Sequence, residues 1–353
     1  MTDRIRKLER IMAILDAAGA DQLELTTPEN LAWFFDGARV AVPLGGPPVF
    51  TASVRRDGCL RVTAFANELE RLRSEELSAP AGSAIRFEPA PWHAPLPVGV
   101  GLRDSDLVDE LRAARAALLP LERRRFAELG ADLAALCTRV LSEARSADTE
   151  RELASRLAGA VVACGAEPVV LLVAGESRLH HRHPLPTTAR LGGRAMVAVG
   201  ARRYGLVGSL TRWLDFRSAT ASDLELALFE VEADALDATR PGRELGDVLT
   251  EIVASYERHG LGADAWLGHH QGGPTGYLGR DPRAAPGSRV RIVSGQAFAW
   301  NPTAPGAKVE DTVVVDDDGI TVLTADPDWP VVDVRGRPRP LALHLPTPST
   351  HKE

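Results

Sequence analysis

The sequence Ala-Val-Gly-Ala-Arg-Arg-Tyr-Gly-Leu-Val-Gly-Ser-Leu-Thr-Arg, residues 198–212, decides how we interpret the rest of the chain. Strand-like runs at 195–200 and 204–210 lie close together, and this pattern predicts a β-hairpin. Ala198 and Ser209 are 11 positions apart within it. The hairpin contains no carboxylate, and its hydroxyl-bearing side chains near the end are Ser209 and Thr211.

Helical and strand-like patterns alternate on both sides of this hairpin. Apolar residues at helical spacing predict long helices before it, and Thr149-Glu-Arg-Glu152 has the form of a capping box. Further helices and strands are expected after it. This mixture predicts an α+β fold. The expected helices are 122–147, 149–164, 222–236 and 245–256, and the expected strands are 168–173, 290–293, 296–300, 309–315 and 320–323.

The first third of the chain has the pattern of a smaller α/β domain. A helix is expected over Ile5 to Leu15, and strands at 49–54 and 60–65 are joined by the turn pair Asp57-Gly58. We divide the chain into a domain at 1–120, a second domain at 121–334 and a Pro-rich, poorly ordered tail at 335–353.

Composition and charge narrow the function classes. The 353 residues are 44% hydrophobic and 25% charged, as in ordinary globular proteins. The net charge of −7 and the lack of basic clusters argue against nucleic-acid binding. The charged N-terminus and the lack of a long apolar run predict a cytoplasmic protein without membrane contact. Cys59, Cys137 and Cys164 have no metal or redox spacing and are expected to be free thiols.

The hairpin resembles that of the creatinase/methionine aminopeptidase/Xaa-Pro dipeptidase superfamily, which has the pita-bread fold. Gly200 and the Thr211-Arg212 pair match the pattern of that superfamily. Its two metal-binding Asp positions fall on Ala198 and Ser209. The resemblance implies a pita-bread second domain, a creatinase-type first domain and a homodimer in which residues near 33–39 reach the partner's pocket.

Other landmarks of the superfamily can be placed along the chain. Its members hold two metal ions with Asp, Asp, His, Glu and Glu. His269 in Gly268-His-His-Gln-Gly272 matches the His ligand, although a shift of one residue would put His270 there. Asn301 replaces the first Glu, and Glu310 matches the second. Ala, Ser and Asn cannot supply the charge that a dinuclear centre needs, so we predict no metal and no cofactor.

Loss of the metal ligands does not by itself imply loss of activity. The resemblance extends to creatinase-like enzymes that hydrolyse C–N bonds without metal and use a His at the position of His183 for proton transfer. Histidine exchanges protons near neutral pH. We therefore predict a metal-independent hydrolase of a small amide or amidine derived from an amino acid, with catalytic residues His183, Glu310, His269 and His270.

Further residues near these motifs are candidates for substrate binding. Asn301 and Gln271 offer hydrogen bonds, and Arg212 and Arg280 are candidate partners for an anion. The full substrate-binding set is Asn301, Gln271, Arg212, His180, His181, Tyr277 and Trp300. Two alternatives stay open: an Xaa-Pro aminopeptidase or dipeptidase with an atypical metal site, and a non-catalytic pita-bread module that binds a peptide or partner.

Overall fold

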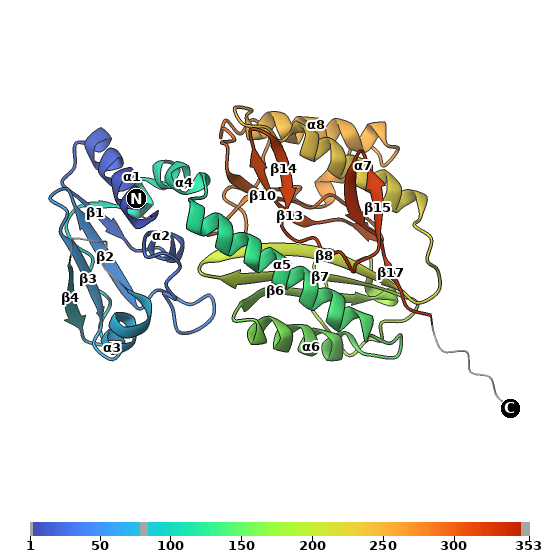
Figure 1. Ribbon diagram of the computed structural model, residues 1–353, viewed down its shortest axis with the longest axis horizontal. Helices are drawn as coiled ribbons and strands as arrows, with labels where there is room; N and C mark the ends of the chain where they lie inside the picture. Colours follow the sequence, from blue (N-terminus) through green and yellow to red (C-terminus); the bar gives the residue numbers. More distant parts are fainter. Residues whose placement is uncertain (1–2, 78–83, 347–353) are drawn as a thin grey trace. The chain divides into compact units, whose positions relative to one another are not determined.

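A computed structural model describes residues 3–77 and 84–346 (Figure 1). The chain forms two compact units. The first comprises residues 1–125 with the short segments 203–206 and 276–278, and the second comprises the remainder. The predicted boundary at 120 falls at the start of helix α5 (Pro120–Ser142), whose first turns belong to the first unit.

The first unit is a five-stranded sheet with helices. The strand order is β4-β3-β2-β1-β5, and β2 and β3 form the predicted hairpin around Gly58. The helix predicted over Ile5 to Leu15 is present as α1. The elements are α1 (Asp3–Ala18), β1 (Gln22–Leu25), α2 (Pro28–Phe34), β2 (Phe50–Arg55), β3 (Leu60–Phe65), α3 (Leu69–Arg71), η1 (Leu72–Glu76), β4 (Ile85–Ala90), β5 (Leu102–Arg103), η2 (Asp104–Asp106) and α4 (Val108–Ala116).

The aromatic part of the segment expected to reach a partner subunit lies in the core of this unit. Trp33, Phe34 and Phe35 are buried, and the rings of Phe34 and Phe35 meet edge to face. The buried ammonium of Lys7 donates a hydrogen bond to the Trp33 carbonyl and pairs with Asp36. The side chains of residues 33–35 are therefore packed within this unit, and the expected contact with a partner subunit stays a prediction.

The second unit contains two four-stranded sheets covered by helices, so the α+β prediction is confirmed. The sheet orders are β17-β8-β7-β6 and β14-β13-β10-β9. The major elements are α5, α6 (Glu150–Ala163), β6 (Glu167–Gly175), β7 (Arg194–Arg203), β8 (Leu206–Asp215), α7 (Asp223–Ala238), α8 (Leu245–Arg258), β9 (Gly272–Thr275), β10 (Gln296–Trp300), β13 (Asp311–Asp316) and β14 (Gly319–Val322). The short elements are η3 (Glu176–Arg178), η4 (Ala265–Gly268), β11 (Thr303–Ala304), β12 (Ala307–Lys308), β15 (Val331–Val334), β16 (Arg337–Pro340) and β17 (Leu343–His344).

The predicted hairpin is formed by β7 and β8. A two-residue turn connects the strands, and both of its residues have positive φ: 52° at Tyr204 and 75° at Gly205. Such a turn matches the natural twist of antiparallel strands. Thr312 joins this sheet to the other, because its hydroxyl donates to the Ser209 carbonyl and accepts from the Ser209 N–H.

The helices begin at capping residues that can be found in the sequence. Thr149 and Glu152 form the predicted capping box of α6, and Ser222 and Glu225 form an equivalent one at α7. Helices α7 and α8 lie side by side over the β10–β13 sheet (Figure 1). Their apolar faces form a core with Phe298 and Val313.

Two local predictions are wrong. The tail prediction fails at residues 337–344, which form β16 and β17; residues 347–353 lie outside the described ranges. Residues 290–293, predicted as a strand, belong to no sheet. Their carbonyls and N–H groups are used elsewhere, because Leu245 N–H donates to Val290 O and Ile292 N–H donates to Arg243 O.

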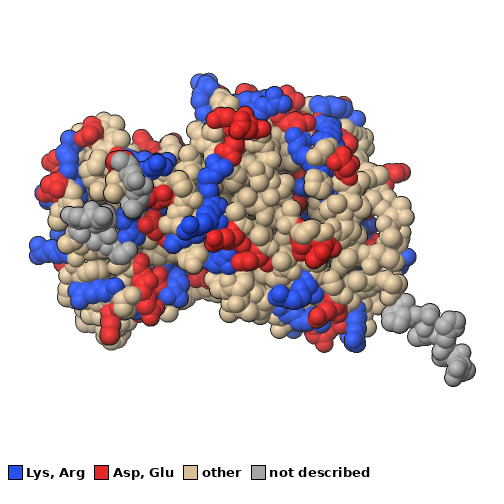
Figure 2. Space-filling model, in the orientation of Figure 1, with Lys and Arg blue, Asp and Glu red and all other residues tan. Residues whose placement is uncertain are grey.

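Within the described ranges, no helix is long and apolar enough to cross a membrane. Basic and acidic side chains alternate over the described surface visible in Figure 2, without a broad area of one sign.

Candidate active site

The two hairpin positions where the superfamily carries Asp are filled without any acidic group. Ala198 is buried on β7 opposite Leu172 of β6. Ser209 is buried on β8, and its backbone is held by Thr312 of β13. The side chains at these positions supply no negative charge.

The retained carboxylate, Glu310, has each of its two oxygens paired with a cationic side chain of the protein. Lys308 Nζ lies 2.6 Å from Oε2, and Arg280 Nη2 lies 2.6 Å from Oε1. The Thr211 hydroxyl donates to Oε2 over 3.0 Å. Burial alone would raise the pKa of Glu310, but the charges of Lys308 and Arg280 lower it to about 2. Glu310 is therefore ionised and fully paired.

The residues present do not fit the dinuclear metal centre of the superfamily. Three of its five ligand positions hold Ala198, Ser209 and Asn301, and the remaining carboxylate already receives two protein cations. Together Lys308, Arg280 and Glu310 carry a net charge of about +1, which repels divalent ions. A pair of bridged divalent ions needs several carboxylates, and this donor set does not supply them.

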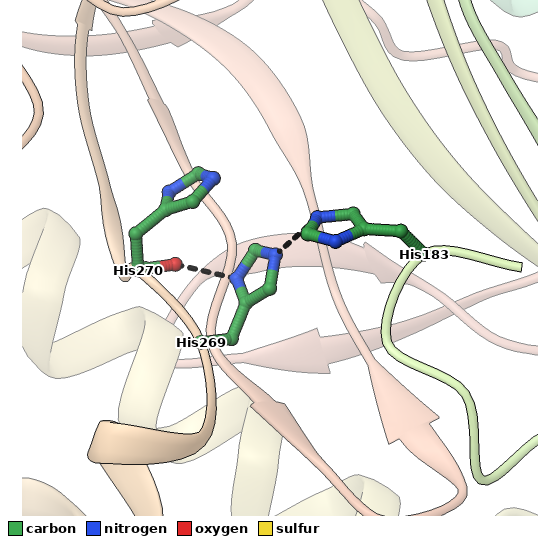
Figure 3. A group of neighbouring side chains, drawn as sticks. All are labelled: His183, His269 and His270. Carbon is green, nitrogen blue, oxygen red and sulfur yellow. Dashed lines mark hydrogen bonds between the residues drawn. The ribbon is translucent and has the colours of Figure 1, made fainter.

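Three histidines meet beside this ion-pair cluster (Figure 3). His183 lies on the loop after β6, and His269 and His270 lie between η4 and β9. One nitrogen of each ring lies within 4.8 Å of the others. His269 stands between its two neighbours, with its Nε2 at 3.1 Å from His183 Nε2. The structure thus brings together three of the four predicted catalytic residues.

The hydrogen bonds define the protonation of His269. Its Nδ1 lies 2.6 Å from the His270 carbonyl, which can only accept, so Nδ1 carries the proton. Burial and the charge of Lys308 lower the pKa of His269 to about 4, so the ring is neutral near pH 7. Its Nε2 then has a lone pair and accepts the hydrogen bond from His183 Nε2–H. A neutral His183 that donates from Nε2 has its lone pair on Nδ1.

His270 is also neutral. Burial, followed by the neighbouring His269 ring and the charge of Arg280, lowers its pKa to about 3. Its Nδ1 is buried and has no hydrogen-bond partner among the described residues. Two further buried polar atoms of this part of the unit share that property, Arg280 Nε and Asn301 Oδ1. Unsatisfied buried groups are costly, and they favour a site that completes its hydrogen bonds with a ligand or water.

A buried carboxylate on α6 holds the loop that carries His183. Glu150 Oε1 accepts from the Gly175 N–H, and Oε2 accepts from the N–H and hydroxyl of Thr187. Arg178, within the loop, also donates to Glu150. Both ends of the 175–187 loop are therefore fixed to one side chain. His180 and His181 lie on this loop with their rings 4.0 Å apart, exposed and outside the three-histidine group.

Several predicted substrate-binding residues have structural roles instead. Arg212 is buried and donates to Asp311 and to the Thr324 carbonyl. Trp300 belongs to the core, where its Nε1–H donates to Thr239. Tyr277 is buried in the first unit and donates to Glu122. A sequence motif indicates the helix or strand on which a residue lies. It does not show whether the side chain points into the packed interior, as these three do.

The side chain of Gln271, another predicted substrate-binding residue, is hydrogen-bonded to neighbouring groups of the protein. Its Oε1 accepts from the Tyr256 hydroxyl, and its Nε2 donates to the carbonyls of Trp266 and His269. These bonds fix the backbone on which His269 is mounted. Gln271 is therefore a positioning residue.

Lys308 is a residue of this cluster that the sequence interpretation missed. A signal for it exists, because residues 308 and 310 are two apart in an extended segment and so share a face. A Lys at that spacing from a retained ligand Glu indicates charge replacement at the metal site.

Comparisons with known proteins agree with this fold. Residues 126–317 match the model of metallopeptidase family M24. The structure is similar to a dipeptidase, PepE from Mycobacterium ulcerans, with a TM-score of 0.73 and 22% identity, covering 93% of this chain and 98% of that one. It is similar to the prolidase from Pyrococcus horikoshii OT3, with a TM-score of 0.70 and 17% identity over 90% and 98% of the two chains.

A third similar structure is named for a complex and not for an activity. It is the N-terminal domain of FACT complex subunit SPT16 from chickpea, with a TM-score of 0.65 and 13% identity over 92% of this chain and 97% of that one. A search of curated proteins gives no match. The class defined by the fold and the matched region is the pita-bread class, as predicted. The chain belongs to metallopeptidase family M24.

Proposed function

We propose that the protein is a metal-independent hydrolase that cleaves a C–N bond of a small amino-acid derivative, an amide or amidine. The observation that carries this proposal is the contact between His183 Nε2 and His269 Nε2, together with the proton fixed on His269 Nδ1. This arrangement leaves His183 with a free basic nitrogen and a partner that orients its ring. Cleavage of C–N bonds is also the reaction of the dipeptidase and prolidase to which the fold is similar.

In the proposed reaction, His183 Nδ1 takes a proton from water while the water oxygen bonds to the amide or amidine carbon. The resulting imidazolium keeps its Nε2–H bond to the neutral His269, which supports the positive charge. His183 then gives the proton from Nδ1 to the leaving nitrogen as the C–N bond breaks. The proton count balances, and no other reactant is needed.

The cationic pair beside Glu310 would stabilise the tetrahedral intermediate. Arg280 Nε–H is buried and without a partner among the described residues, so it can donate to an oxyanion. The ammonium of Lys308, which lies 2.6 Å from Glu310 Oε2, adds positive electrostatic potential at the oxyanion. In this proposal Glu310 holds the two cations in place and does not itself contact metal.

The two alternatives differ in what they require. A conventional Xaa-Pro peptidase would need metal, in spite of the residues at positions 198, 209 and 301. A binding module, as the name of the chickpea relative allows, would need no free base on His183. The buried atoms of Arg280 and Asn301 without partners would serve ligand binding in either case.

The test is a hydrolysis screen of small amides, amidines and Xaa-Pro dipeptides, run with and without a chelator. We expect turnover of an amide or amidine that is unchanged by the chelator. Activity that disappears on chelation and returns with Mn²⁺ or Co²⁺ would support the metallopeptidase alternative and contradict the proposal. Tight binding of a small amide without turnover would favour the binding module.

A further inference from the structure

The three imidazoles form a compact set of nitrogen donors that shares only His269 with the ligand set of the family. It includes His183 and His270 and needs none of the lost carboxylate positions. The rings of His269 and His270 lie 4.2 Å apart, and those of His183 and His269 lie 5.0 Å apart. All three rings converge on one region (Figure 3).

We propose that His183, His269 and His270 bind a single ion of the Zn²⁺, Cu²⁺, Ni²⁺ or Co²⁺ class, and that this ion inhibits the protein. The binding part stands on the geometry of the three rings alone. The inhibition part rests on the proposed function, because it concerns the proton transfer assigned to His183.

The spacing of the nitrogens suits one ion. Zinc–nitrogen bonds of 2.0–2.1 Å in a tetrahedral site place two ligand nitrogens about 3.3 Å apart. His183 Nε2 and His269 Nε2 are 3.1 Å apart, and the group as a whole lies within 4.8 Å. Small side-chain rotations therefore close the site, and a fourth position stays open for water or a substrate atom.

The hydrogen bond at the second ring nitrogen of His269 orients the ring for metal binding. Metal-bound histidines commonly donate their second N–H to a backbone carbonyl, which fixes the tautomer and directs the lone pair at the ion. His269 Nδ1 makes this contact with the His270 carbonyl. Gln271 holds the neighbouring His269 carbonyl, so the backbone of both histidines is fixed. The buried Nδ1 of His270, which has no partner in the described structure, gains one if it ligates.

The donor set selects the class of ion. Three neutral imidazoles suit Zn²⁺, Cu²⁺, Ni²⁺ and Co²⁺, whereas Mg²⁺ and Ca²⁺ prefer oxygen ligands. The nearby cations Lys308 and Arg280 oppose an added positive charge, and Glu310 is already neutralised by them. The ion is therefore held reversibly, which suits inhibition better than a permanent structural site.

Binding of the ion removes the base from the reaction. Coordination through His183 Nε2 displaces the hydrogen bond to His269 and requires that the imidazole proton reside on Nδ1. The Nδ1 lone pair that would accept a proton from water is then lost. Inhibition follows from the ligand geometry without any movement of the fold.

The binding test uses the full-length, tag-free protein titrated with Co²⁺ and followed by visible absorption. We expect saturation at one equivalent, with the intense bands of a four-coordinate ion, and displacement by Zn²⁺. The variants His269→Ala and His270→Gln should weaken binding by at least about tenfold. His180→Ala and His181→Ala are matched controls from the same loop region and should bind as the wild type does.

The outcomes separate the two proposals. No saturable Co²⁺ site, or equal loss in the His180→Ala and His181→Ala controls, would overturn the metal site and leave the proposed hydrolase untouched. Circular dichroism establishes that each variant is folded, so loss of binding can be assigned to the ligand. Once a substrate is known, Zn²⁺ should inhibit turnover at the same concentration at which it displaces Co²⁺; bound Zn²⁺ with full activity would overturn the inhibitory role alone.

Discussion

Lys308 and Arg280 are the residues that most clearly separate this protein from a dinuclear metallopeptidase. Each makes a 2.6 Å contact with one oxygen of Glu310, so the carboxylate that matches a metal ligand is neutralised by side chains. An ion pair in this buried position is costly to break, because the partner left behind is an unpaired buried charge.

The first prediction concerns that charge balance. Glu310→Gln should lower the free energy of unfolding by about 3 kcal/mol, because it leaves Lys308 and Arg280 facing each other without a counter-charge. Urea denaturation measures the change. The double variant Glu310→Gln with Lys308→Met should recover part of the loss. A double variant less stable than the sum of the two single changes would contradict this account.

His183 is the residue on which the proposed chemistry depends. His183→Ala should reduce kcat/KM by about 10²–10⁴-fold, the usual contribution of a general acid–base residue. The stability should change little, because the side chain is exposed. His93→Ala, an exposed histidine of the first unit, is the control and should keep full activity. An unchanged rate in the His183 variant would exclude it as the proton carrier.

At the scale of elements, the loop 175–187 is positioned by α6. Glu150 binds both loop ends, so the position of His183 depends on a residue at the start of α6 that lies 33 positions earlier in the chain. Burial would raise the pKa of Glu150, but hydrogen bonds from Thr187 and Gly175 and the charge of Arg178 lower it.

Glu150→Gln should therefore destabilise the protein by about 1–3 kcal/mol near pH 7. A carboxyl with a lowered folded pKa stabilises the fold above its ordinary value of 4.5, and this stabilisation is lost as the pH falls through the folded pKa. The gap in unfolding free energy between wild type and variant should thus be widest above pH 5 and shrink in acid. A gap that widens in acid would contradict the assignment. Glu152→Gln, on the exposed side of the same helix start, serves as a comparison.

Two helical glycines give opposite predictions. A Cβ at Gly130 in α5 would come within 2.4 Å of the Leu323 carbonyl oxygen, so Gly130→Ala should destabilise the protein in spite of the higher helix propensity of Ala. A Cβ at Gly159 in α6 would meet no atom within 4 Å, so Gly159→Ala should stabilise by up to about 1 kcal/mol. Thermal unfolding of both variants measures the contrast, and a stabilising Gly130→Ala would refute the close approach of α5 and residue 323.

At the scale of the whole molecule, residues 337–344 are part of the second unit. Arg339 of β16 is buried and donates two 2.6 Å hydrogen bonds to Glu232 of α7 and one to Asp311 of β13. Arg212 of β8 donates to the other oxygen of Asp311. This network connects four elements that are far apart in the sequence.

Arg339→Met should destabilise the protein by about 2–4 kcal/mol, because it leaves Glu232 buried without its partner. Burial raises the pKa of Glu232 to about 7, so protonation of this carboxyl limits the loss. Arg335→Ala removes three ion pairs of a partly exposed side chain, with Glu230, Asp234 and Asp237, and should cost no more than about 1 kcal/mol. Equal losses in the two variants, measured by urea denaturation, would contradict a special role for the buried network.

The homodimer expected from the superfamily stays a prediction. Light scattering of the purified protein measures its mass directly, and a monomer at micromolar concentration would contradict it.

The sequence by itself determined the fold class and the three histidine positions. Local signals were enough for this, because capping residues, apolar periodicity and turn glycines act over a few residues, as at Thr149, Ser222 and Gly205. The spacing of motifs also located His183, His269 and Glu310 and the missing carboxylates at Ala198 and Ser209.

Only the tertiary structure decided which polar residues reach the site. Arg212, Gln271 and Trp300 look like binding groups in the sequence, yet each satisfies its hydrogen bonds inside the second unit. Arg280 became a partner of Glu310 because folding joined segments thirty residues apart, whereas Lys308 lies only two residues from Glu310 in the chain. The direction of a side chain depends on burial and on contacts distant in the chain, and a local pattern of residues does not contain that information.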